Sequence, residues 1–194
     1  MTSPIDSNEV RITGENSFIR LHKQEGGPEL TRASHWRVLW SPGGPGHVLY
    51  LKSGDLTAGK VRIYSDNPHM ARWLQGEIES MLFPEFADQS LPIIDAIFER
   101  EGDSISFSRE VVEARDETIH LSWWDFLTPI MVAKAAGSLA IGPHGVYTVL
   151  IPGLGAQVTL NDVAAAGQPV PDKRGDRDAS SACLAWSETW VRPS

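Results

Sequence analysis

The sequence predicts a mainly β protein, an antiparallel barrel or sandwich that carries one amphipathic helix. The first observation is a series of short apolar runs of strand length, each bounded by glycine, proline or polar turn residues. The runs cover residues 35–40, 47–54, 59–66, 93–101, 104–114, 118–126, 145–153, 156–162 and 182–191. Several of them are joined by short polar or glycine-bearing connections, at 55–59, 101–103, 114–117 and 153–155. Such connections favour hairpins, and therefore antiparallel neighbours.

The second observation is a single stretch with helical periodicity, which predicts a helix over residues 68–83. Asp66 or Asn67 can cap this helix, Pro68 suits its first position, and Pro84 ends it. Its apolar residues recur at helical spacing and are Met70, Trp73, Leu74, Ile78, Met81 and Leu82.

Length and composition indicate one β-rich domain at residues 18–194, preceded by a polar tail at 1–17. The 194 residues fit one domain with a sizeable core, and the single cysteine rules out an internal disulfide. A net charge of −8 without a basic stripe argues against a nucleic-acid partner. Neither a signal peptide nor an apolar run of membrane-spanning length is visible, so we expect no membrane partner and a cytoplasmic location.

Charged residues on apolar faces are the strongest hint of a site. At helical spacing Glu77 falls in the middle of the apolar stripe. On strands, alternation places Arg109 beside Phe107 and Val111, and Glu188 between Trp186 and Trp190. A buried carboxyl group gains a raised pKa, which suits acid–base chemistry. The alternatives are a frayed helix end or an edge position for Glu77, and a structural ion pair or a covered outer face for the strand residues.

The segment TIHLSWWDF, residues 118–126, adds a titratable candidate. Alternation puts His120 on the face of Trp124, and Asp125 on the other face. Either His120 borders a cavity, or it is a hydrogen-bonded histidine on a strand face that another element covers.

Tryptophans supply the apolar walls that a small-molecule pocket needs. Trp36 and Trp40 are four residues apart and share a strand face in this interpretation, and Trp124, Trp186 and Trp190 are further candidates. A well-packed core would use the same residues.

No metal site and no cofactor are expected. The six histidines are scattered without a metal-binding motif, and the glycine stretches GGPG and GLG lack a nucleotide-binding fingerprint.

These observations favour a small-molecule-binding β-barrel with its pocket in the open end of the barrel. As a cofactor-independent isomerase, lyase or hydratase acting on a small polar ligand, it would use Glu77 or His120 as base, Glu188 as acid and Arg109 as anion stabiliser. The alternatives are a ligand-binding module without chemistry and an accessory subunit, and a homo-oligomer stays open. The predicted barrel has a lipocalin-like shape, an analogy of architecture that carries no function.

Overall fold

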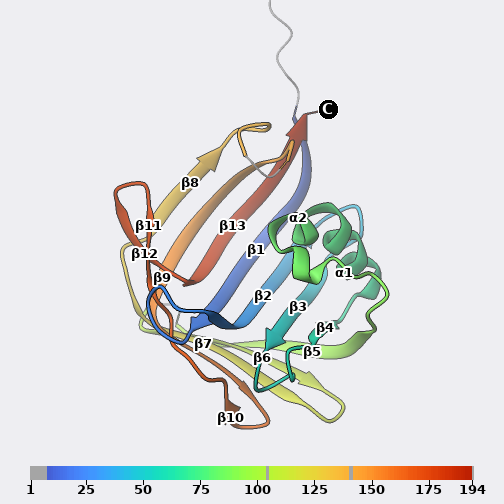
Figure 1. The fold of residues 1–194 in the computed structure, drawn as a ribbon. Helices are drawn as coiled ribbons and strands as arrows, with labels where there is room; N and C mark the ends of the chain where they lie inside the picture. Colours follow the sequence, from blue (N-terminus) through green and yellow to red (C-terminus); the bar gives the residue numbers. More distant parts are fainter. Residues whose placement is uncertain (1–7, 104, 140–141, 194) are drawn as a thin grey trace, which may run out of the picture.

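The computed structural model describes residues 8–103, 105–139 and 142–193, and its main feature is a closed nine-strand β-barrel (Figure 1). The strands follow one another around the barrel in the order β9, β13, β1, β2, β3, β4, β5, β6 and β7, and β7 pairs with β9 to close it. Their bounds are β1 Asn8–His22, β2 Glu29–Trp40, β3 Gly46–Ser53, β4 Val61–Ser65, β5 Ile93–Gly102, β6 Phe107–Ala114, β7 Thr118–Phe126, β9 Gly145–Leu160 and β13 Ala182–Pro193. The mainly β prediction is confirmed.

The barrel is mixed rather than purely antiparallel. The predicted hairpins at 55–59, 101–103 and 114–117 join antiparallel neighbours, whereas β4 and β5 are parallel. The chain between β4 and β5 contains the helix, and a parallel pair requires a connection of this length. Two short strands and a separate hairpin complete the fold: β8 Ile130–Lys134 and β10 Val163–Ala164 pair with β9, and β11 Pro171–Arg174 pairs with β12 Arg177–Ser180.

The predicted hairpin at 153–155 is wrong, because β9 runs through it without a turn. The glycines there make room for a neighbour on β7. A Cβ atom on Gly155 would lie 2.0 Å from the indole nitrogen of Trp124. The sequence signal of these glycines therefore marks a close approach inside a strand, not a chain reversal.

The helix occupies residues 68–82, as predicted, but it is not a uniform α-helix. It consists of α1 Pro68–Leu74, the π-helical segment η1 Gln75–Glu79 and α2 Ser80–Leu82, and the short 3-10 turn η2 Pro84–Phe86 follows. The Asn67 side chain accepts a hydrogen bond from the backbone N–H of Met70 and caps the first turn. No helix in the described ranges is both long and apolar enough to cross a membrane.

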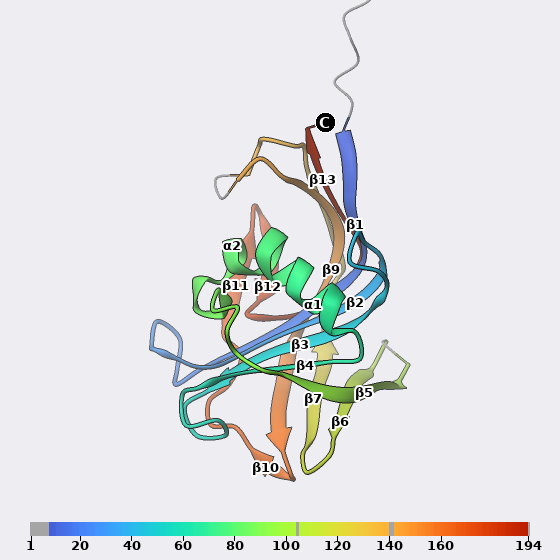
Figure 2. The same ribbon diagram turned by 90° about the vertical axis from the view of Figure 1, so that its right-hand side faces the viewer.

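Two apolar cores lie on opposite faces of the β1–β2–β3 layer. Odd-numbered Ile19 and Leu21 belong to the core inside the barrel. On β2 and β3, Trp36 and Tyr50 belong to the second core, which also contains Leu74 of the helix. Figure 2 shows the helix and the β11–β12 hairpin standing on the same side of this layer. The helix therefore covers the outside of the barrel and does not plug it.

Strand β1 begins inside the segment that was expected to be a polar tail. Residues 8–17 belong to β1, and the expected tail at 1–7 lies outside the described residues. Arg11, Asn16 and Ser17 are buried polar residues in this strand, and Asn16 donates a hydrogen bond to Ser34 on β2. Because these buried positions are polar, the apolar alternation that normally reveals a strand is missing.

Candidate functional site

A cavity of about 630 Å³ lies on the outer face of the barrel, between the end of the helix and the β11–β12 hairpin. We call it the outer cavity. Its apolar lining consists of Phe18, Leu82, Phe83, Val132, Leu139, Val146, Leu150, Val170, Pro171 and Trp190. Its polar lining consists of Asn16, Arg20, His22, Thr148, Asp172, Arg174, Ser181 and Glu188. This size and this mainly apolar lining with a few polar groups are typical of small-molecule sites. The predicted pocket in the barrel mouth is replaced by a cavity outside the barrel wall.

Glu188 is the buried carboxyl group of the outer cavity. It is 4% exposed, and Trp190 donates its indole N–H to Oε1 at 2.6 Å. Burial raises the pKa of Glu188 to about 7, although hydrogen bonds from Trp190 and Thr148 work in the opposite direction. At neutral pH this side chain can therefore both give and take a proton.

A bulge in β13 decides which side chains enter the cavity. Trp186 pairs with Val149 and Thr189 pairs with Tyr147, so β13 contains one extra residue between these pairs. An extra residue reverses the alternation beyond it. Glu188 and Trp190 consequently face the outer cavity, while half-buried Trp186 packs against the core inside the barrel. The prediction that Trp186 shares a face with Glu188 is wrong for this reason.

The helix contributes a second buried carboxyl group, Glu79, which the sequence analysis did not single out. Glu79 is fully buried and accepts the indole N–H of Trp36 at 2.7 Å. Burial raises its pKa to about 7, while hydrogen bonds from Trp36 and Ser34 oppose the rise. Ser34 also accepts a hydrogen bond from the side-chain amide of Asn16, which lines the cavity. Glu79 is therefore connected to the cavity lining through one intervening side chain, that of Ser34.

The π-helical segment explains why the projection at 3.6 residues per turn failed. The wider π turn shifts the phase of the helix, so buried positions recur every four residues, at 70, 74 and 78 and at 71, 75 and 79. Glu79 joins the buried face as a result. The burial of Glu79 could have been predicted only if the π-helical segment had been known, and the sequence contains no signal for that segment.

Glu77, the predicted base, lies at the edge of the helix and does not line the outer cavity. Its Oε1 is 2.8 Å from Arg11 Nε and 3.2 Å from His144 Nε2. Hydrogen bonds from Arg11 and His144 outweigh partial burial, so the pKa of Glu77 is lowered. The expectation of a core-facing carboxyl group with a raised pKa is wrong at this position. His144 also packs edge-on against Trp190, which links Glu77 to the cavity wall only indirectly.

Arg109, His120 and Trp124 lie on the outer face of β6 and β7, away from the outer cavity. Ser108 and Glu110 are buried on β6, and Ile119, Leu121 and Trp123 are buried on β7. Alternation then turns the intervening residues outward. Arg109 is 35% exposed and pairs with Glu101 at 3.3 Å. The predicted inward face of Arg109 is wrong, and the structure does not bring Arg109 or His120 together with Glu188.

The predicted wall of Trp36 and Trp40 is also divided by a bulge. Along β1 and β2, Thr13 pairs with Trp40 and Gly14 pairs with Val38, which leaves Leu39 as the extra residue. Trp36 is fully buried under the helix, whereas Trp40 is 50% exposed. Neither borders the outer cavity.

The inward-facing charges of the barrel belong to residues that the sequence did not single out. Glu110 is 1% exposed, and Arg100 Nε donates to its Oε1 at 2.5 Å. Arg37 Nη2 lies 3.5 Å from Glu110 Oε2, and Arg100 also pairs with Glu15. This cluster is the buried ion pair that was expected around Arg109, displaced by one residue along β6.

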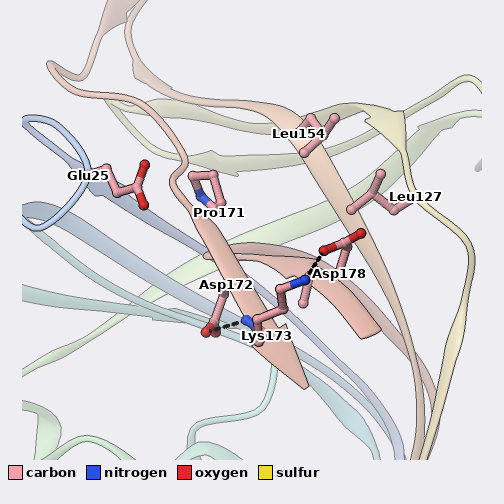
Figure 3. A pocket seen from close by; sticks show the side chains of 8 residues that line it. Glu25, Leu127, Leu154, Pro171, Asp172, Lys173 and Asp178 are labelled. Atoms are coloured by element: carbon pink, nitrogen blue, oxygen red, sulfur yellow. Dashed lines mark hydrogen bonds and ion pairs between the residues drawn. The ribbon is translucent and has the colours of Figure 1, made fainter. Parts of the chain in front are cut away.

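A second hollow, of about 560 Å³, borders the same hairpin (Figure 3). Pro171 and Asp172 line both hollows. Lys173 pairs with Asp178 across the hairpin, as Figure 3 shows, and this pair is well exposed. The second hollow contains no buried ionisable side chain among its described lining residues. The outer cavity is therefore the stronger candidate.

Within residues 8–103, 105–139 and 142–193, no group of three or more His, Cys, Asp or Glu side chains is arranged to hold a metal ion. The chain matches no model of a known protein family, and neither a search of curated proteins nor a search of solved structures returned a match.

Proposed function

We propose that this protein binds a small organic molecule in the outer cavity. The observation that carries the proposal is the buried carboxyl group of Glu188 in the lining of a mainly apolar cavity of about 630 Å³. Burying a carboxyl group is costly, and a core that served packing alone would more simply use an apolar residue at that position. Its position in the lining allows the Glu188 carboxyl group to orient a ligand.

Binding of a neutral apolar dye, N-phenyl-1-naphthylamine, tests this proposal. The dye fluoresces when it enters an apolar site, and we expect saturable binding at one site. Val132 lines the cavity from β8, so Val132→Trp should fill it and abolish binding. Ala133 is the next residue on β8 and is exposed on the opposite face, so Ala133→Trp is the matched control and should bind normally. Equal binding by both variants would place the dye elsewhere and refute the proposal.

Acid–base catalysis in the same cavity is a second candidate, favoured by the pKa of Glu188 of about 7. Here Glu188 would take a proton from a bound molecule and return it at another atom. The purified protein is first extracted to look for a copurifying small molecule. A compound found in this way is incubated with the protein in D₂O, and deuterium incorporation is measured by mass spectrometry. Incorporation by the wild type and not by Glu188→Gln supports catalysis. Incorporation by neither protein leaves a binding module without chemistry.

A further inference from the structure

We infer that the ligand of the outer cavity is an elongated amphipathic carboxylate whose anionic group lies at Arg20 and Arg174. This inference rests on the proposed function, because it names the class of molecule that the same cavity takes. It depends on the shape of the cavity and on the distribution of charge along it.

The outer cavity is long, because its polar residues lie at two distant levels of β1. At one end, Glu188 pairs with Gly14. At the other end, the backbone N–H of Arg20 donates to Ser181 at 3.0 Å. Six residues separate these levels, which at about 3.3 Å per residue is about 20 Å along the strand. The shape suits an elongated ligand.

The end near the hairpin is cationic. Arg20 and Arg174 both line the cavity there, and Asp172 is the carboxylate between them. Asp172 Oδ2 lies 3.2 Å from Arg174 Nη1 but 3.8 Å from the nearest Arg20 nitrogen. Among the described residues the Arg20 guanidinium makes no hydrogen bond, although its side chain is only 27% exposed. The carboxylate of Asp172 is thus shared by two guanidinium groups. Guanidinium N–H groups therefore remain that can donate hydrogen bonds to a second carboxylate.

The remaining neighbours do not supply that second carboxylate. Glu29 is held by Arg32, whose Nε lies 2.7 Å from its Oε1. Burial lowers the pKa of Arg20. The negative charges of Glu29 and Asp172 raise this pKa, but the positive charges of Arg32 and Arg174 lower it, and the net shift is downward. The Arg20 cation is therefore incompletely neutralised, which is the state that a ligand anion would relieve.

The opposite end excludes an anion and the middle is apolar. Glu188 occupies the far end, and a ligand carboxylate there would meet a group that is itself negative in its ionised form. Between the two ends, Phe18 and Leu150 line the cavity and suit a hydrocarbon segment. The ligand's orientation follows: the carboxylate lies at the hairpin and its tail points toward Glu188.

The test compares cis-parinaric acid with the corresponding alcohol, a neutral probe with the same fluorescent chain. We expect the wild type to bind the acid at least about tenfold more tightly than the alcohol, since hydrogen bonds to charged groups contribute at this level. Arg20→Gln and Arg174→Gln should each remove most of that preference by weakening the binding of the acid more than that of the alcohol. Asp172→Asn should strengthen acid binding. Arg177, the exposed cross-strand partner of Arg174, does not line the cavity, so Arg177→Gln is the matched control.

Each outcome separates the two proposals. If the acid and the alcohol bind equally, and Val132→Trp abolishes both, the cavity binds ligands but the anionic class is wrong. If neither probe binds the wild type, this inference is overturned whatever the result with N-phenyl-1-naphthylamine, and failure of that dye as well overturns the proposed function. If Arg177→Gln loses the preference as strongly as Arg174→Gln does, the effect reflects the charge of the hairpin and not the cavity.

Discussion

The buried carboxyl group of Glu188 should make the stability of the protein depend on pH in a direction opposite to that of a salt-bridged carboxylate. Its pKa is about 7 in the folded protein, against an ordinary value of 4.5. A raised folded-state pKa contributes stability that is fully present below pH 4.5 and is lost as the pH rises through 7. The difference between about 7 and 4.5 is about 2.5 pKa units, which corresponds to about 3 kcal/mol at about 1.4 kcal/mol per unit.

Replacing Glu188 with Gln isolates this contribution. Glutamine is nearly isosteric and cannot ionise, so the free energy of unfolding of Glu188→Gln relative to wild type should rise by about 2–3 kcal/mol between about pH 5 and about pH 8. Glu79 has a pKa of about 7 as well, but it is present in both proteins and cancels in the difference. Urea unfolding followed by far-ultraviolet circular dichroism at several pH values measures the effect.

The control for this experiment is Glu113→Gln, which removes one carboxylate from an exposed position on β6. It should leave the difference from wild type within about 0.5 kcal/mol across the same range. A difference between Glu188→Gln and wild type that does not change with pH would refute the reasoning, because the pKa of Glu188 would then be the same in the folded and unfolded states.

Three further outcomes are expected. Glu110→Gln leaves the partly buried guanidinium groups of Arg100 and Arg37 without their buried carboxylate and should cost about 3–5 kcal/mol of unfolding free energy, whereas Glu101→Gln, in an exposed pair, should cost less than about 1 kcal/mol; similar losses would contradict a buried network. Gly14→Ala places a Cβ atom 2.1 Å from a backbone oxygen of β2 and should cost about 1–3 kcal/mol, while Gly54→Ala, with its nearest neighbour at 3.7 Å, should cost far less in the same urea titration. Glu77→Gln should reduce stability by about 1–2 kcal/mol near neutral pH and by less in acid, because the lowered pKa of Glu77 contributes stability that disappears as the pH falls; dye binding should be unchanged, and its loss would give Glu77 a role in the site.

Much of the architecture could be predicted from local signals. Asn67 and Pro68 marked the helix start correctly, because capping and a fixed proline φ are properties of adjacent residues. The strands around 118–126 and 182–191 were visible because apolar and β-branched residues cluster between turns. The signal misled at Gly155, where glycine serves the approach of Trp124 and not a turn.

The candidate site was predicted in part. Alternation found Glu188 and Trp190 as neighbours on one face, and that relation holds because both lie beyond the bulge in β13. It failed for Trp186, which lies before the bulge. For Arg109 it chose the wrong face, since residues of both faces of β6 are apolar enough to be buried.

The sequence by itself determined most of the barrel strands, the single helix among them, and a carboxyl group beside tryptophan. Those features depend on residues that are neighbours along one chain segment. Only the tertiary structure decided that the helix packs outside the barrel, that Glu79 is the buried carboxyl group of the helix, and that Glu188 shares a cavity with Arg20 and Arg174. The two bulges and the π turn each move the side chains that follow them to a different face. The pairing of strands that are distant in the sequence then brings these side chains together.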